Sequence, residues 1–188
     1  MTTYEGGQRG DGTRIAVVCS RFNESITERL LAGALDGLRG AGVDDGSITV
    51  TWVPGAFELP LAALRLAGSG EFDAVVCLGA VVRGATGHYE QVAGQCAAGI
   101  QRAQMDTGVP VIFGVLTTDT VDQALERAGA GAGEAAGYAR TEHTEAEVAR
   151  TPAGASGSPP LSNKGFEAAM AALEMCDLLR QLPKSPRA

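Results

Sequence analysis

The chain has 188 residues, of which 22 are acidic and 15 basic, and its formal net charge is -7 at pH 7. A chain of this length buries enough apolar surface for one sizeable core, so we expect a single domain over residues 1–188. The acidic balance, without any run of Lys or Arg, disfavours nucleic acids and anionic membranes as partners. Because no apolar run approaches the ~20 residues of a membrane helix, we expect a cytoplasmic protein with small-molecule ligands.

The predicted elements alternate between strand and helix. Four short runs rich in Val and Ile hardly alternate with polar residues, which is typical of strands buried on both faces of a parallel sheet. Between them, apolar residues recur at helical spacing, so we expect an α/β layered domain with right-handed crossovers. In chain order the predicted elements are a strand at Ile15–Ser20, a helix around Ile26–Leu38, a strand at Ile48–Val53, a helix at Phe57–Ala67, a strand at Ala74–Val82, a helix at Tyr89–Met105, a strand at Pro110–Leu116, and helices at Asp119–Ala128 and Asn163–Leu182.

One long segment interrupts this pattern. Residues 134–162 contain few apolar side chains and end in a cluster of Gly, Ser and Pro, so we interpret them as a surface insertion between the fourth and fifth helices. Thr141–Arg150 could form a short helix. A connection of this length is usually functional or disordered, and the sequence leaves both open. Residues 183–188 form a tail.

The four cysteines are widely spaced and lie in apolar stretches, without any C-x-x-C pair. Zinc sites and redox dithiols usually place two cysteines close together, whereas isolated cysteines pack as small buried side chains. We therefore predict core thiols and no metal site. The four residues are Cys19, Cys77, Cys96 and Cys176.

Polar and aromatic residues gather where the predicted strands end. Such segments are Arg21–Asn23, Pro54–Glu58, Arg83–His88 and Thr117–Asp119. In a parallel sheet these ends share one rim, outside which ligands bind. The first strand is not followed by G-x-G-x-x-G, and no Walker A pattern occurs, so a dinucleotide or P-loop site is disfavoured. A flavodoxin-like module that holds a flavin also fits the layers, since fold alone does not assign function.

The stretch "RGATGHY", from Arg83 to Tyr89, is the most informative of these segments. Gly84–Gly87 can present backbone N–H groups at a helix start, which suits phosphate, although a plain turn capped by Thr86 fits as well. His88 can accept or relay a proton near neutral pH, but a lone histidine is often incidental.

Four other residues each allow two interpretations. Phe22 and Phe57 are either core side chains or rings that stack on a ligand. Glu58 either caps its helix or accepts hydrogen bonds from a polar heterocycle. Arg127 either lies in solvent at a helix end or clamps a phosphate. Trp52 lies inside a strand and is expected in the core.

Several long motifs in order resemble the lumazine synthase family, also called 6,7-dimethyl-8-ribityllumazine synthase. The resemblance begins near Tyr4 and covers nearly everything except the insertion and the tail. It implies a flavodoxin-like three-layer α/β/α sandwich with a four-stranded parallel sheet. The motifs are "SRFNESIT", "VPGAFELP", "CLGAVVRGATGHYEQVA", "GVPVIFGVLTTDTVDQALERAG" and "NKGFEAAMAALEMCDLL".

The resemblance implies a transferase of riboflavin biosynthesis that needs no cofactor. Family members condense 5-amino-6-(D-ribitylamino)uracil with 3,4-dihydroxy-2-butanone 4-phosphate to 6,7-dimethyl-8-ribityllumazine, releasing phosphate and water. A non-catalytic relative that binds lumazine or flavin, or chiefly forms a shell, remains the alternative.

The same resemblance assigns roles to individual residues. His88 transfers protons, Phe22 stacks on the pyrimidine ring, and Ala85 and Thr86 hold the butanone phosphate together with Arg127. The full set of expected substrate-binding residues is Phe22, Asn23, Ala56, Phe57, Glu58, Val81, Val82, Ala85, Thr86, Phe113, Arg127 and Lys164.

The resemblance also implies pentamers with active sites at subunit boundaries. Phe113 would reach in from a neighbouring subunit, and the N-terminal segment near Tyr4 would add to a neighbour's sheet. Many members assemble twelve pentamers into an icosahedral shell of 60 subunits, and riboflavin synthase is a candidate partner. Small residues in the third helix, from Ala93 to Gly99, would permit close helix contact, between subunits or within one.

This chain departs from the family pattern at three places. Gly87 stands where the family usually has proline, and Glu90-Gln91 replaces a common Asp-Tyr pair. Glycine loosens the turn before His88, so the phosphate loop is expected to be less preorganised. The insertion lies where pentamers of the family meet, so we expect at least a pentamer and leave the closed shell open.

Overall fold

A computed structural model describes residues 1–130 and 163–183 of the chain. The predicted insertion at 134–162, with its candidate helix at Thr141–Arg150, therefore lies outside the described residues, as does the tail beyond Pro183.

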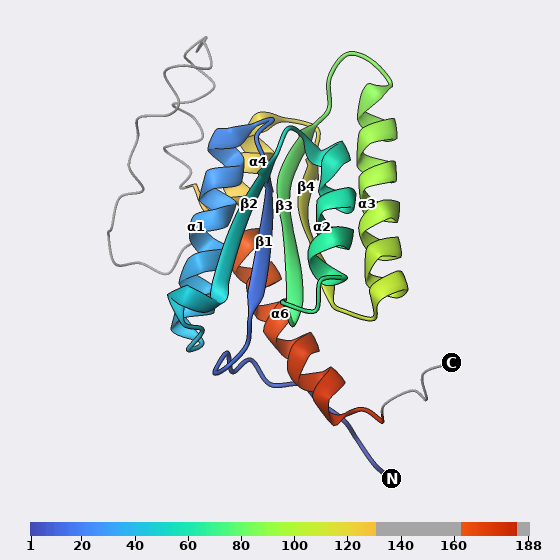
Figure 1. Ribbon diagram of the computed structural model, residues 1–188. Coiled ribbons are helices and arrows are strands. Elements are labelled where there is room, and N and C mark those ends of the chain that lie inside the picture. The colour runs from blue at the N-terminus through green and yellow to red at the C-terminus, as the bar shows by residue number, and fades with distance from the viewer. Residues whose placement is uncertain (131–162, 184–188) are drawn as a thin grey trace.

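The described residues contain one four-stranded parallel sheet, as the sequence predicts. Its strands are β1 (Ile15–Ser20), β2 (Ile48–Val53), β3 (Ala74–Val82) and β4 (Val111–Thr118), in the order β2-β1-β3-β4. All three neighbouring pairs are parallel. The carboxyl ends of all four strands consequently lie at the same end of the sheet (Figure 1). The last strand continues to Thr118, past the predicted end at Leu116.

Helices cover both faces of this sheet and complete three layers (Figure 1). One face carries α1 (Glu24–Gly40), α4 (Val121–Arg127) and α6 (Lys164–Gln181), and the other carries α2 (Leu59–Ala67) and α3 (His88–Thr107). Short 3-10 helices at Asp45–Ser47 and Ala56–Glu58 precede β2 and α2. The predicted helix at Phe57–Ala67 is thus a 3-10 turn followed by an α-helix.

The core has two halves, one on each side of the sheet. Along β1, Ile15, Val17 and Cys19 pack toward α1 and α6, while Ala16 and Val18 pack toward α2 and α3. Every residue of β1 is buried, which explains why its sequence does not alternate. Burial of apolar surface at about 25 cal/mol per Å² makes these two interfaces the main source of stability.

The prediction of burial on both faces is wrong for β2. Thr49 and Val50 in the middle of this strand are exposed, because β2 lies at the edge of the sheet and pairs with β1 alone. Trp52 is half-buried against the core rather than within it. The other edge strand, β4, also exposes side chains, at Phe113 and Thr117.

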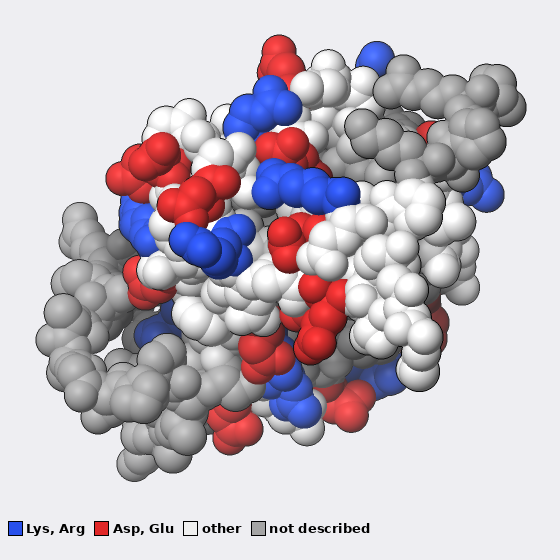
Figure 2. All heavy atoms as spheres, turned by 90° about the horizontal axis from the view of Figure 1, so that it is seen from below, with Lys and Arg blue, Asp and Glu red and all other residues white. Residues whose placement is uncertain are grey.

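The surface at the amino ends of the strands carries charges of both signs. Figure 2 shows this end of the molecule, where acidic and basic side chains lie intermixed. None of the helices in residues 1–130 and 163–183 is long and apolar enough to cross a membrane. The same residues contain no group of three His, Cys, Asp or Glu side chains that could hold a metal ion.

The four cysteines are buried free thiols, which confirms the sequence prediction. Burial raises the pKa of Cys19 to about 12 and that of Cys96 to about 11. It raises the pKa of Cys77 further, and it brings that of Cys176 to about 11. Since thiolate is the reactive form, these thiols are protected both by packing and by protonation.

We therefore expect iodoacetamide at pH 8 to leave the native thiols unlabelled and to label all of them after denaturation, as measured by intact mass.

Folding raises these pKa values above the ordinary value of 9.0, so stability present below pH 9 is lost as the pH rises toward 11. Urea denaturation from pH 8 to 10 should show the free energy of unfolding falling less steeply in Cys19→Ala than in wild type. Equal slopes would contradict this assignment.

Candidate active site

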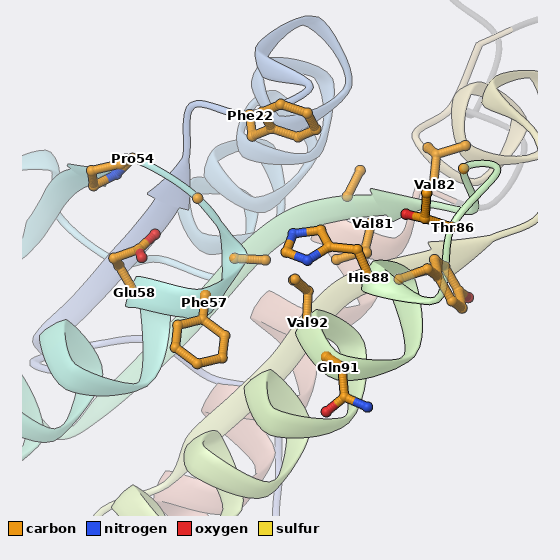
Figure 3. Close-up of a pocket in the computed structure, with 15 residues that line it drawn as sticks. Phe22, Pro54, Phe57, Glu58, Val81, Val82, Thr86, His88, Gln91 and Val92 are labelled. Atoms are coloured by element: carbon orange, nitrogen blue, oxygen red, sulfur yellow. The ribbon is translucent and has the colours of Figure 1, made fainter.

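A cavity of about 650 Å³ opens at the carboxyl ends of β1, β2 and β3 (Figure 3). This volume lies within the range of small-molecule sites. Its walls come from the β1–α1 turn, the segment between β2 and α2, the end of β3 and the start of α3. The lining residues are Phe22, Pro54, Gly55, Ala56, Phe57, Glu58, Ala80, Val81, Val82, Gly84, Thr86, His88, Tyr89, Gln91 and Val92.

The β1–α1 turn carries Phe22 to the cavity. The next residue, Asn23, adopts the left-handed backbone conformation with φ 60°, which is uncommon for residues other than glycine. The Asn23 amide donates to the Ala80 carbonyl at the end of β3 over 2.9 Å, and Phe22 N–H donates to the Pro54 carbonyl over 3.1 Å. Among the described residues Asn23 does not line the cavity. It holds the turn that presents Phe22.

The segment after β2 presents Phe57 and Glu58. Phe57 is 57% exposed and Phe22 69%, so neither ring belongs to the core and the stacking interpretation remains for both. Glu58 stands at the N-cap of α2, but its side chain makes no cap hydrogen bond. Within the described residues its carboxylate has no hydrogen-bond partner and is free to accept one from a ligand.

The segment after β3 brings backbone N–H groups and an imidazole to the same cavity. Among the described residues, the N–H groups of Gly84, Ala85 and Thr86 have no hydrogen-bond partner. The N-cap residue of α3 is Gly87, and no side chain makes a cap hydrogen bond there. Thr86 is therefore not the cap of this helix, and it lines the cavity. His88 is the first residue of α3, and in Figure 3 its ring lies between Phe22 and Val92.

Three further lining residues on α3, Tyr89, Gln91 and Val92, were not predicted from the sequence. Val92 lies four residues after His88, on the same face of the helix, and Gln91 lies beside it. Helical spacing from His88 would have identified Val92, once the start of α3 was known. Gln91 places an amide in the wall.

An ion-pair network borders the cavity, and the sequence predictions omitted it. The Arg83 guanidinium donates to Asp119 over 2.7 Å and to Glu90, and it lies 4.3 Å from the centre of the Tyr89 ring. The hydrogen bonds that the guanidinium donates to Asp119 and Glu90 raise the pKa of Arg83. The backbone N–H of Glu90 and the Arg83 guanidinium lower the pKa of Glu90.

Three of the predicted site residues lie elsewhere on the subunit. Phe113, Arg127 and Lys164 line a second depression of about 380 Å³ along the edge strand β4 and the start of α6. The Arg127 guanidinium donates to the Gln123 carbonyl over 3.5 Å, and the Lys164 ammonium lies 2.5 Å from the Glu167 carboxylate. The described residues therefore divide the predicted site between two places on the chain.

Asn163 fixes the geometry of this second depression and was not predicted either. Its amide nitrogen donates to the Arg29 and Ala128 carbonyls, both over 2.9 Å, and its oxygen accepts from Gly165 N–H over 2.8 Å. These bonds join α1, the end of α4 and the start of α6. Lys164 is thereby placed beside the helix that carries Arg127.

Ala85 is the remaining predicted residue. It is exposed on the loop before α3, but it is not among the described residues that line the cavity.

Comparison with known families gives one match over most of the chain. The family model described as 6,7-dimethyl-8-ribityllumazine synthase matches residues 12–180. The match includes every strand of the sheet, all residues that line the cavity and all residues that line the second depression. The chain therefore belongs to the lumazine synthase family, which serves riboflavin biosynthesis.

Proposed function

We propose that the protein catalyses the condensation of 5-amino-6-(D-ribitylamino)uracil with 3,4-dihydroxy-2-butanone 4-phosphate to 6,7-dimethyl-8-ribityllumazine. The observation that carries this is the content of one cavity in a member of this family. Two exposed aromatic rings, an unpartnered carboxylate, an imidazole and free backbone N–H groups all border it.

The pyrimidine is assigned to the side of the cavity formed by Phe22 and Glu58. A flat exposed ring at a cavity mouth gains contact and loses solvent exposure when it stacks on a heterocycle. The free carboxylate of Glu58 can accept hydrogen bonds from the N–H and O–H groups of this substrate. Val81 and Val82, at the end of β3, are assigned backbone contacts to the ring edge.

The phosphate is assigned to the loop before α3. Three backbone N–H groups from Gly84 to Thr86 lack partners within residues 1–130 and 163–183, and the N-terminus of a 20-residue helix adds a favourable field for an anion. Thr86 supplies a hydroxyl to the same wall. The butanone carbonyl is then held near His88.

The chemistry then requires two substrates held close and protons moved between them. Amine attack on the ketone with loss of one water, loss of phosphate, and ring closure with loss of a second water each transfer protons among nitrogen, carbon and oxygen. His88 can accept and return these protons, which typically contributes about 10²–10⁴ in rate. Orientation of two bound reactants supplies much of the remainder, since effective molarities reach about 10⁵ M or more.

The complete site is shared between two subunits of a pentamer. The second depression holds the two cations, Arg127 and Lys164, together with the ring of Phe113, which is 43% exposed. A cyclic arrangement can place this depression of one subunit against the cavity of its neighbour. Arg127 and Lys164 would then approach the phosphate from the side opposite the loop.

Exposed apolar side chains support contact between copies of the chain. Leu61 on α2 is 66% exposed and Met105 on α3 is 74% exposed. Ala97 and Ala98 also lie exposed on α3, whereas Gly99 packs closely on Pro60 within the subunit. The small residues of α3 thus serve both kinds of contact. A pentamer buries such side chains.

The N-terminal segment can contribute to the same assembly. Gly7 N–H donates to the Asp177 carboxylate over 2.7 Å, and the Gln181 amide donates to the Glu5 carbonyl over 2.8 Å. These bonds hold the segment along α6 of its own subunit. Residues before Glu5, including the half-exposed Tyr4, remain for pairing with the free edge of a neighbour's β2.

Replacing His88 should slow the condensation without preventing binding. We expect His88→Ala to lower kcat by about a hundredfold, because the variant loses a group that transfers protons. Formation of the lumazine chromophore from the two substrates measures this, with the uncatalysed rate subtracted. His143→Ala, which removes the other histidine, is the matched control and should retain wild-type kcat. An unchanged kcat in His88→Ala would leave orientation as the source of catalysis, and a wild type without acceleration would overturn the proposed activity.

Mixing two inactive variants should restore activity if the site is shared. We expect pentamers refolded from equal amounts of His88→Ala and Arg127→Ala to recover about a quarter of wild-type activity, because that share of interfaces unites two intact halves. Each variant alone, refolded in the same way, is the control. Native mass spectrometry establishes that mixed pentamers formed. Mixed pentamers no more active than the controls would place both residues in one subunit's site.

A further inference from the structure

Arg83 does not line the cavity, but its side chain joins the segments on either side of the phosphate loop. Its guanidinium binds Glu90 in the first turn of α3 and binds Asp119, just after β4, over 2.7 Å. The same group lies over the Tyr89 ring. Its backbone N–H donates to the Thr118 carbonyl over 2.9 Å, so the backbone and the side chain of Arg83 are both bonded at the end of β4.

The loop that Arg83 closes has little packing of its own. Within the described part of the chain, a Cβ at Gly84 would meet nothing within 4 Å, and at Gly87 only the Glu90 carboxylate, at 3.8 Å. The loop N–H groups from Gly84 to Thr86 also lack partners among the described residues. Its conformation therefore depends on how its two ends are held.

Asp119 extends the connection to the next helix. Its backbone N–H donates to the side-chain oxygen of Gln123 over 3.0 Å, within the first turn of α4. The Thr120 hydroxyl caps the same helix by accepting from Gln123 N–H over 3.2 Å. Arg83 thus ties the loop before α3 to the start of α4, the helix that carries Arg127 at its other end.

We propose that Arg83 is a positioning residue that holds the Gly84–Gly87 loop in the form that binds phosphate and fixes His88 beside it. This rests on the proposed function, because it assigns the loop to the phosphate-bearing substrate. The side chain acts through Glu90 and Asp119 and touches no substrate itself. Its two-pronged donor geometry suits two carboxylates at once, which a lysine ammonium on a flexible stem matches poorly.

A local role is distinguishable from a general contribution to stability. The three charged side chains are 45%, 53% and 68% exposed, and exposed pairs contribute little to the free energy of unfolding. We therefore expect Arg83→Ala to melt close to the wild-type temperature. Hydrogen exchange of residues 92–96, whose amides bond within the first turns of α3, should nevertheless accelerate, by about threefold, because the start of this helix loses its attachment to Arg83.

Steady-state kinetics test the consequence for the reaction. In Arg83→Ala we expect the KM for the butanone phosphate to rise about tenfold, while the KM for the ribitylaminouracil stays within about twofold. Arg83→Lys should give an intermediate KM. Arg39→Ala is the matched control, because Arg39 also pairs through Nε with an exposed carboxylate, that of Asp45, over 2.7 Å, but away from the cavity. This variant should change neither KM nor the exchange of residues 92–96.

Binding of inorganic phosphate separates this proposal from the proposed function. Titration followed by phosphorus NMR should show the dissociation constant rising about tenfold in Arg83→Ala and unchanged in Arg39→Ala. This result, with faster exchange of residues 92–96, supports the positioning role even if wild type does not condense the two substrates. Equal rises in both KM values, or unchanged exchange and phosphate binding, would overturn it.

Discussion

The parallel pairing of β1 with β3 is the constraint on which the rest of the structure depends. Both strands are buried on two faces, so their backbone groups are satisfied by neighbouring strands, which here run in the same direction. Parallel pairing forces a helical crossover after each strand and brings all carboxyl ends to one edge. The turns that follow β1, β2 and β3 must therefore meet, and the cavity forms where they do.

Much of the fold could be predicted because its signals are local. Strands such as β3 are continuous apolar runs, and helices such as α1 show regular apolar spacing, so the alternation of elements was visible. Burial at the sheet edges was not visible, because Val50 resembles a core residue in sequence and is exposed only through the strand order. The 3-10 turn before α2 was also missed, since helical spacing does not separate it from the helix that follows.

The candidate site was predictable where residues follow strand ends and unpredictable where side chains act over a distance. His88, Glu58 and the two phenylalanines could be assigned to one rim from their positions alone. The left-handed Asn23 could not, because its conformation depends on a carbonyl 57 residues away in the chain. The separation of Arg127 from His88 likewise depends on β4 lying at the opposite edge from β2, which no local pattern encodes.

The bonds of Asn163 have a consequence for how the chain tolerates change. Its amide binds the Ala128 carbonyl over 2.9 Å and is almost wholly buried, so residues 128 and 163 are held at adjacent, anchored points. Because closing a longer loop costs little additional entropy, the length between these points can vary without moving α4 or α6. The position is therefore a natural attachment point for grafted sequence, where cargo could be displayed while the sheet and the cavity keep their geometry.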